Sequence, residues 1–336
     1  MRIILDGMGG DNAPREIVKG AAEISSLIDH EICIVGDEER IKSLLAEFEH
    51  DAKRISILHA PDVIGNEDSP VKAVRRKKDS SLVKGMEAVK NGEGDLFISA
   101  GNSGAIMSGG VFLLGRIRGI DRPAIGSTYP ILGEGGASLL IDSGANAECK
   151  PQNLLQFAVM GSIYAKLVLE KRNPSVGLVN MGTEPGKGSA MVKDAFELLE
   201  RSRNGKANIN FIGNVEARDV PIGICDVIVC DGFIGNVILK MTEGVALSIS
   251  HLIRRKFSEG VLAKAGAALL YNKLGELKKA FDYTEYGGAP ILGVKGAAVK
   301  LHGSSSAKAV RNGIARAIPF MEHNVVATIE NAMAGL

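Results

Sequence analysis

Short β-branched segments alternate with helical segments along most of the chain, and this alternation constrains the fold more than any other feature. Eight segments have the length and composition of β-strands: RIILD, EICIVG, RISILHA, DLFISA, ASLLID, SVGLVN, INFIG and DVIVCD. Helical patterns separate most of them, most clearly at residues 151–169 and 189–201. Such alternation predicts a three-layer αβα fold of the α/β class, with a largely parallel sheet between helices. The glycines at 133–136 predict a hairpin between AIGSTYPIL and ASLLID, so we expect a mixed sheet.

The alternation breaks between about residues 236 and 283, where no strand pattern occurs. Apolar side chains recur there at helical spacing in two stripes. A segment rich in glycine, alanine and leucine lies between the stripes and favours a turn between two helices. We therefore predict a projecting helical hairpin over residues 237–283, within one domain that spans residues 1–336. The stripes are Ile238, Val245, Ile249 and Leu252, and then Leu270, Leu274, Leu277 and Phe281.

Charge and motif content exclude several classes of protein. The formal net charge of +1 argues against a dedicated nucleic-acid-binding protein. No CxxC pair or zinc-like spacing occurs, the histidines are scattered, and no GxGxxG follows the first strand, so we expect neither a metal nor a dinucleotide cofactor. The N-terminus does not resemble a signal peptide, and no apolar run approaches the ~20 residues of a membrane span. These features predict a cytoplasmic protein with reduced thiols.

Four glycine-containing turns share one template, in which a strand ends and small or amide residues begin a helix. Free N–H groups at a helix N-terminus attract anions, so the four turns together predict a phosphate-like ligand, although each alone is more often structural. The segment MGTEPGKGS lacks two required residues of a P-loop, which disfavours nucleotide hydrolysis. The turns contain Gly101, Asn102, Ser103 and Gly104; Asn180, Lys187 and Gly188; Asp231, Gly232, Gly235, Asn236 and Lys240; and His302, Gly303 and Ser304.

Long motifs identify a family that the chain resembles nearly from end to end. They include LDGMGGDNAP, ISAGNSGA, IDSGANAECKPQNLLQFAVMG, VGLVNMGTEPGKG, DVIVCDGFIGNVILKMTEG, DYTEYGGAPILG and HGSSS. In these motifs the chain is similar to the PlsX family of phosphate acyltransferases, which transfer a fatty acyl group from acyl-acyl carrier protein to inorganic phosphate. The resemblance implies an isocitrate/isopropylmalate dehydrogenase-like fold of two intertwined lobes with a cleft, and a homodimer. It also implies that a membrane acyl-phosphate:glycerol-3-phosphate acyltransferase consumes the product.

The resemblance implies that residues of the four glycine-containing turns form the active site. Phosphate needs N–H donors and cations, and the attacked thioester carbonyl needs donors of its own. The candidate catalytic residues are Asn102, Lys187, Asp231 and His302. The candidate phosphate-binding residues are Gly101, Ser103, Gly104, Asn180, Gly232, Gly235, Asn236, Lys240, Gly303 and Ser304. Because acyl carrier proteins are acidic, the basic residues predicted to dock them are Arg75, Arg76, Arg254 and Arg255.

The turn of the predicted hairpin combines large apolar residues with flanking basic ones. This composition predicts shallow insertion into a membrane beside anionic headgroups, and packing against a second subunit is the alternative. The predicted tip residues are Val261, Leu262, Leu269 and Leu270. Three other functions stay open at this point: a β-decarboxylating dehydrogenase, a phosphotransacetylase-like enzyme of the same fold, and a non-catalytic membrane scaffold.

Overall fold

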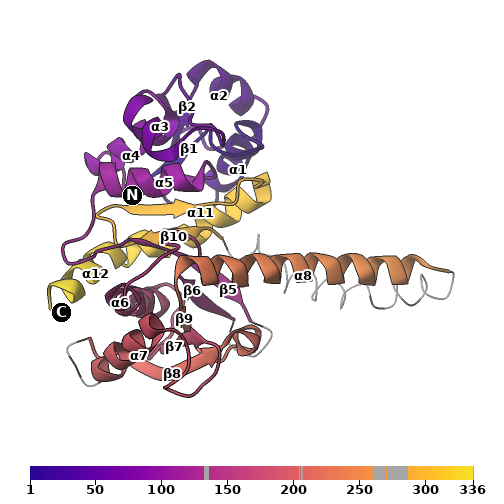
Figure 1. The fold of residues 1–336 in the computed structure, drawn as a ribbon. Helices are drawn as coiled ribbons and strands as arrows, with labels where there is room; N and C mark the ends of the chain where they lie inside the picture. Colours follow the sequence, from indigo (N-terminus) through magenta and orange to yellow (C-terminus); the bar gives the residue numbers. More distant parts are fainter. Residues whose placement is uncertain are drawn as a thin grey trace.

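A single 11-stranded mixed sheet runs through the molecule (Figure 1), in the order β3-β2-β1-β4-β11-β10-β5-β6-β9-β7-β8. The computed structural model describes residues 1–131, 136–203, 205, 207–260, 266, 270 and 287–335. The strands are β1 (Arg2–Asp6), β2 (Glu31–Gly36), β3 (Ile55–His59), β4 (Leu96–Ser99), β5 (Ala124–Pro130), β6 (Ala137–Ile141), β7 (Ser175–Asn180), β8 (Asn210–Glu216), β9 (Val227–Val229), β10 (Ala289–Leu292) and β11 (Ala297–Lys300).

Helices cover both faces of this sheet. The apolar sides of α1, α2, α6, α7, α11 and α12 form one continuous core with one face. On the other face, α3, α4, α5 and η1 cover the first strands, whereas α8 covers part of the later ones. The helices are α1 (Arg15–Ser25), α2 (Glu38–Leu45), α3 (Pro70–Arg76), α4 (Ser81–Lys90), α5 (Ser103–Gly109), the π-helix η1 (Gly110–Leu114), α6 (Pro151–Leu167), α7 (Ala190–Ser202), the 3-10 helix η2 (Ala217–Ile222), α8 (Gly232–Ser258), α11 (Ala307–Glu322) and α12 (Val325–Ala334).

The mixed, largely parallel sheet confirms the sequence prediction. Parallel pairs form two blocks, β3-β2-β1-β4-β11 and β6-β9-β7-β8. Strands β5 and β6 are antiparallel, as the predicted hairpin requires, although residues 132–135 of its turn lie outside the described part. Two strands were missed. β10 and β11 lie at the centre of the sheet and are antiparallel to each other.

The antiparallel centre reverses the direction of the sheet. Three successive antiparallel steps, β11-β10, β10-β5 and β5-β6, make β6, β7 and β9 run in the opposite sense to β1, β4 and β11. The glycine turns after these strands therefore form two groups at different ends of the sheet. Helix α8 begins in the second group and extends far out of the body (Figure 1). The rest of the predicted hairpin, beyond residue 260, falls almost wholly outside the described residues.

Candidate functional site

A buried carboxylate holds together the turns that follow β1 and β4. Asp6, the last residue of β1, is almost completely buried, and burial raises its pKa. Its oxygens accept hydrogen bonds from the Met8 N–H (3.2 Å) and from Ser99 Oγ (2.7 Å). Ser99 Oγ in turn accepts from the Gly101 N–H at 3.0 Å. These bonds keep both glycine turns in contact at one end of the sheet.

A second buried carboxylate organises the turn after β6. Asp142 is completely buried, and burial raises its pKa. Its Oδ1 accepts from the N–H groups of Ile125 (3.1 Å), Gly144 (3.2 Å) and Ala145 (3.0 Å). Its Oδ2 accepts from the backbone N–H and the side-chain amide of Asn146, at 2.7 and 2.8 Å. The loop is thus folded around one carboxylate, because the consecutive N–H groups of Gly144, Ala145 and Asn146 all donate to it.

The first turn of α8 packs on this Asp142 loop. The Gly232 N–H donates to the Asn146 carbonyl at 2.7 Å, so this amide is already used within the protein. A side-chain carbon at Gly235 would collide with the Asp142 carbonyl oxygen. Asp231 caps the helix by accepting from the Ile234 N–H at 2.8 Å. The two glycines therefore allow close contact between backbones, a role that the sequence could not distinguish from phosphate binding.

Asn236 and Lys240 are exposed and lie on the same face of α8, because residues four apart in a helix are neighbours. Lys240 Nζ forms an ion pair with Glu243 Oε2 at 2.7 Å. Lys240 is also close enough to the turn after β11 for its charge to lower the pKa of His302, although α8 begins after β9, in the other block of parallel strands. The structure thus brings a cation of α8, one turn beyond Asn236, near the HGSSS turn.

The HGSSS turn is fastened to the loop after β1. The His302 ring nitrogen Nδ1 lies 2.8 Å from Ser304 Oγ, and the Gly303 carbonyl accepts from the Asp11 N–H at 2.8 Å. The Asn12 side chain donates to the Ser304 carbonyl at 3.1 Å. Loss of water around the ring lowers the pKa of His302, and the nearby ammonium groups of two lysines lower it further. A neutral imidazole next to two cations suits an anion-binding site.

The second of these lysines, Lys300, was missed by the sequence analysis. It is the last residue of β11 and is half-buried, and burial together with the neighbouring Lys240 lowers its pKa. Along the strand, Val299 packs with the core on one face of the sheet and Ala298 with the core on the other, so Lys300 lies on the face of Ala298. Its only signal in the sequence is a charge inside the apolar run AAVKL.

Asn102 caps α5 and also meets the loop between β3 and α3. Its Oδ1 accepts from the Ala105 N–H at 3.0 Å, and its Nδ2 donates to the carbonyls of Gly65 (3.4 Å) and Asn66 (3.3 Å). The amide is thereby held in one orientation. Gly101, Ser103 and Gly104 surround this cap, and a side chain at Gly104 would meet Pro70. Asn102 and His302 belong to the same group of loops.

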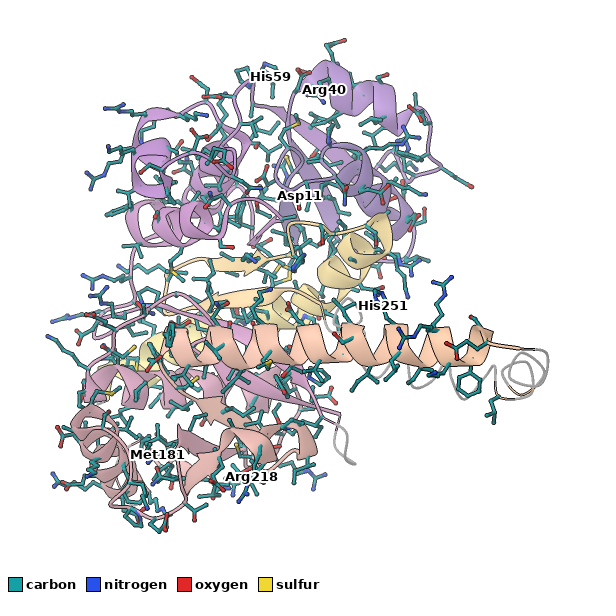
Figure 2. The ribbon with its side chains drawn as sticks, turned by 45° about the vertical axis from the view of Figure 1, so that its right-hand side comes forward. Asp11, Arg40, His59, Met181, Arg218 and His251 are labelled. Atoms are coloured by element: carbon teal, nitrogen blue, oxygen red, sulfur yellow. The ribbon has the colours of Figure 1, made fainter. Side chains whose placement is uncertain are left out.

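Asn180 and Lys187 belong to a different loop. The Asn180 side chain accepts from the Met181 N–H at 2.8 Å and donates to the Lys187 carbonyl at 3.0 Å, which closes the segment 181–188. Figure 2 shows Met181 far from Asp11, whose backbone N–H donates to the HGSSS turn. The structure therefore does not bring the exposed Lys187 together with His302.

The predicted docking and membrane residues lie at the surface. Arg75 and Arg76 end α3, and the Arg75 guanidinium stacks over the exposed Phe112 ring at 4.9 Å. Arg254 and Arg255 are exposed near the end of α8. Of the predicted membrane tip, Leu270 is exposed, and the other three residues lie outside the described part: Val261, Leu262 and Leu269.

The thiols are poorly suited to attack. Burial raises the pKa of Cys149 to about 11 and that of Cys225 to about 12, and it also raises the pKa of Cys230. Within the described part of the chain, no group of three or more His, Cys, Asp or Glu side chains is arranged to hold a metal ion. The charged groups that act on His302 are instead the ammonium groups of Lys240 and Lys300, whose effect on its pKa is larger than that of the carboxylates of Glu243 and Asp11, and this balance suits an anion.

Comparison with solved structures shows the same fold in phosphotransacetylases. The chain aligns with a phosphotransacetylase from Streptococcus pyogenes with a TM-score of 0.62 and 16% identity, covering 99% of this chain and 94% of that one. The EutD phosphotransacetylase from Staphylococcus aureus gives a TM-score of 0.57 and 17% identity, covering 100% and 94%. At such identities the similarity concerns the fold alone.

Comparison with curated proteins gives much closer relatives. The chain is 50% identical over 336 residues to a phosphate acyltransferase of Alkaliphilus oremlandii, covering 100% of this chain and 98% of the relative. It is 47% identical over 337 residues to a phosphate acyltransferase of Thermoanaerobacter pseudethanolicus, covering 100% and 98%. The family model described as "Fatty acid synthesis protein" matches residues 1–328. The resemblance drawn from the motifs is therefore confirmed, and the chain belongs to this family of fatty acid synthesis proteins.

Proposed function

We propose that the protein is a phosphate acyltransferase that moves a fatty acyl group from acyl-acyl carrier protein to inorganic phosphate. The product is an acyl phosphate for phospholipid synthesis. The observation that carries this proposal is the full-length identity of about one half to proteins named phosphate acyltransferase. The charges near the end of β11 add a physical reason. Lys240 and Lys300 lie near His302, and two ammonium groups beside a turn suit a small anion such as phosphate.

The residues divide into an anion side and a thioester side. We assign phosphate to the space bordered by Asn236, Lys240, Lys300 and the HGSSS turn. Gly303 and Ser304 are the residues of that turn predicted to bind it. A thioester that is attacked by phosphate develops negative charge on its carbonyl oxygen, so it needs one or two hydrogen-bond donors. Asn102 and His302 remain the candidates for that role, whereas Lys187 lies in the separate loop after β7 and is not assigned to it. Asp231 acts as the helix cap that positions α8.

Phosphate itself is the nucleophile in this scheme. One of its oxygens forms a bond to the thioester carbon, and the carbon–sulfur bond breaks to release the thiol of the carrier. Inorganic phosphate is partly dianionic at neutral pH and needs no strong base. The protein then contributes proximity and stabilisation of the oxyanion. The raised pKa values of Cys149 and Cys230 fit a direct transfer better than a thiolate intermediate.

The deciding experiment measures phosphate-dependent release of free carrier protein from a long-chain acyl-carrier protein, with the acyl phosphate trapped by hydroxylamine. We expect release only when both substrates are present. A phosphotransacetylase-like activity is the second candidate, because the phosphotransacetylases share the fold. It predicts that a short acyl-coenzyme A is used faster than the acyl-carrier protein. Reduction of a nicotinamide cofactor with a hydroxy acid would instead indicate a dehydrogenase.

We propose that the carrier protein docks on Arg75 and Arg76, with Arg254 and Arg255 as a second basic surface. Reversing Arg75 and Arg76 to Glu should raise the Michaelis constant for the acyl-carrier protein, because complementary charge mainly speeds association. The constant for phosphate should not change, and the effect should shrink at high salt. The pair Arg254→Glu and Arg255→Glu tests the second surface separately. Unchanged constants in both pairs would place docking elsewhere.

Helix α8 presents an uncovered apolar stripe, and we propose that a second copy of the chain packs against it. Its length and composition would allow it to cross a membrane, and one such helix among the described residues is weak evidence, since core helices of soluble proteins pass the same test. Its first turn is packed on the Asp142 loop, and Lys240 and Glu243 interrupt its apolar sequence. The stripe consists of Ile234, Val237, Met241, Val245, Ile249 and Leu252, all of them exposed.

The remaining predictions concern location and domain organisation. We propose a cytoplasmic protein that touches the membrane through the hairpin tip, where the acyl phosphate passes to a membrane acyltransferase. We also propose one domain of two intertwined lobes with the site between them, in an isocitrate/isopropylmalate dehydrogenase-like fold. Binding of the purified protein to vesicles that contain anionic lipid tests the membrane contact, and Leu270→Glu should weaken it.

A further inference from the structure

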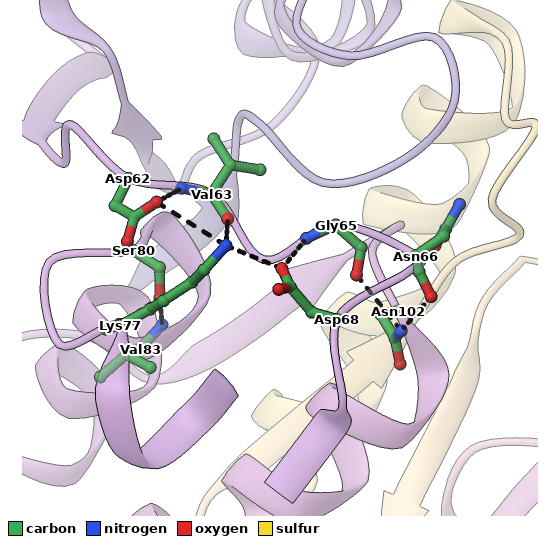
Figure 3. A network of polar contacts seen from close by, with 9 residues as sticks. All are labelled: Asp62, Val63, Gly65, Asn66, Asp68, Lys77, Ser80, Val83 and Asn102. Atoms are coloured by element: carbon green, nitrogen blue, oxygen red, sulfur yellow. Dashed lines mark hydrogen bonds and ion pairs between the residues drawn. The ribbon is translucent and has the colours of Figure 1, made fainter. Parts of the chain in front are cut away.

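Lys77 differs from the other members of the RRKK cluster because its side chain turns inward. Arg75, Arg76 and Lys78 are exposed, whereas the Lys77 ammonium donates to the Val63 carbonyl at 2.8 Å and to Asp68 Oδ2 at 2.7 Å. Only 32% of the Lys77 side chain and 30% of the Asp68 side chain are accessible to solvent. In Figure 3 the ammonium lies among Asp62, Val63 and Asp68, on the inner side of the loop between β3 and α3.

The same loop, residues 60–69, contacts the candidate site on its other side. Asp68 Oδ2 also accepts from the Gly65 N–H at 2.8 Å. The carbonyls of Gly65 and Asn66 accept from the Asn102 side chain, and the Asn66 side chain donates to Asp11 Oδ1 at 3.2 Å. A continuous chain of polar contacts therefore leads from the end of α3 to the Asn102 cap (Figure 3). The Asn66 amide extends it to the Asp11 side chain, and the Asp11 backbone N–H donates to the Gly303 carbonyl of the HGSSS turn.

The geometry of Asn102 depends on this loop. Its Oδ1 is fixed by the Ala105 N–H, so its two amide hydrogens point where the Gly65 and Asn66 carbonyls stand. Asp68 holds that part of the loop by its bond to the Gly65 N–H, and Lys77 holds Asp68. Hydrogen bonds to charged groups are about twice as strong as neutral ones, so the ammonium is the strongest fastening in the chain of contacts.

We propose that Lys77 is a positioning residue: by fastening Asp68 and Val63 it sets the loop that orients Asn102 and Asp11, and it links helix α3 to the site. This inference rests on the proposed acyl transfer. Because α3 also carries Arg75 and Arg76, a carrier protein bound there would contact the helix whose end holds the loop. Lys77 thus acts through the loop and does not itself touch substrate or carrier.

The test replaces each partner of the ion pair. In both Lys77→Met and Asp68→Asn the kcat of acyl transfer should fall roughly tenfold or more, because small displacements of positioned groups cost this much. The double variant should lose much less than the product of the two single losses, since both changes break the same ion pair. Lys72→Met, an exposed lysine of the same helix, serves as the control and should keep the wild-type kcat. Lys77→Arg keeps the charge and should recover part of the rate.

Lys77 and Asp68 carry opposite charges, so their variants distinguish a positioning role of Lys77 from a role in binding the carrier protein. If Lys77 merely attracted an acidic carrier, Lys77→Met would raise the Michaelis constant for the carrier, Asp68→Asn would lower it, and neither would change kcat. That outcome would overturn the proposal. A uniform loss of thermal stability that matches the loss of rate in both variants would also overturn it. The pair is one-third exposed, so we expect melting temperatures close to that of the wild type.

Hydrogen exchange gives a readout that does not depend on turnover. The amides of residues 62–68 should exchange faster in Lys77→Met and in Asp68→Asn, while those of β1 and β4 stay protected. Unchanged exchange in this loop would refute the fastening even if the rate fell. If the wild-type protein released no carrier in the presence of phosphate, the proposed function would fail, and the exchange measurement would still decide whether Lys77 holds the loop.

Discussion

Two buried aspartates each hold the loop that follows them in the sequence. Asp6 follows the strand RIIL and Asp142 follows ASLLI, and each accepts N–H bonds from the glycine-containing segment after it. Burial of a carboxylate is costly unless several donors face it. Backbone N–H groups supply those donors here, so the loops take their shapes from the two carboxylates. The candidate site residues on these loops depend on the two buried carboxyl groups.

Asp142→Asn should be strongly destabilising. Both carboxylate oxygens accept N–H bonds, so either orientation of an amide would point its NH2 group at other donors. Leaving buried donors unsatisfied costs about 1–3 kcal/mol each. We expect a lower melting temperature in a calorimetric scan, whereas the exposed Asp194→Asn in α7 should leave it unchanged. Equal melting temperatures for the two variants would show that the loop does not need the charge.

Lys300→Met should raise the Michaelis constant for phosphate by tenfold or more, since it removes a half-buried cation, and charge-assisted bonds to anions are strong. The pKa of Lys300 is lowered, so its cation is fully present below that pKa and is lost as pH rises through it. Phosphate binding should therefore weaken at alkaline pH earlier than for an ordinary lysine. In Lys300→Arg this loss should move to higher pH, because arginine stays protonated. Lys295→Met, which changes an exposed lysine in the turn before β11, should leave the profile unchanged.

Sequence could not separate Lys77 and Lys300 from ordinary surface lysines. RRKK is a uniform basic run, and only the tertiary contact with Val63 and Asp68 distinguishes its third member. Lys300 stands in a short strand that the sequence analysis missed altogether. By contrast, Asn102, Asp231 and His302 stand within glycine-containing turns that the sequence located correctly, since the cap and turn chemistry is local. Local patterns thus predicted the turns, and long-range packing decided which of them meet.

At the scale of elements, the strands β10 and β11 show why part of the fold was missed. Their sequences, APIL and AAVK, are four residues long, contain alanine and proline, and are separated by GVKG. Neither shows the alternation or the β-branched content of a typical strand. They are nevertheless at the centre of the sheet, because β4 and β5 supply partners on either side. Tertiary context outweighed local preference here.

Helix α8 is expected to form the interface between two copies of the chain. Its exposed stripe recurs every three or four residues, which is the spacing of a helix that packs against another surface. Met241→Glu with Val245→Glu should convert a dimer into a monomer in light scattering, because burying two carboxylates is unfavourable. Leu247→Glu is the matched control: it is equally apolar and exposed but lies off the stripe. A dimer that survives the double variant would exclude α8 as its interface.

The whole molecule joins two oppositely directed blocks of parallel strands. Helix α8 starts at the turn of the second block and brings Lys240 to the turn of the first, where Lys300 and His302 lie. A site assembled in this way can hold two substrates at once. We therefore expect a ternary complex, and the order of the strands explains why no single sequence motif contains the site.

The last prediction follows from this arrangement: acyl transfer proceeds without an acyl-enzyme. A two-step route needs an activated cysteine or serine. The thiols of Cys149 and Cys230 are held neutral by their raised pKa values, and Ser304 is the serine that lies against a histidine ring. Replacing each cysteine by Ala or Ser should leave most of the activity, and initial-rate plots at several phosphate concentrations should intersect. Incubation with labelled acyl-carrier protein and no phosphate should leave the protein unlabelled. Parallel plots, or a label on Ser304 or on any cysteine, would instead establish the two-step route.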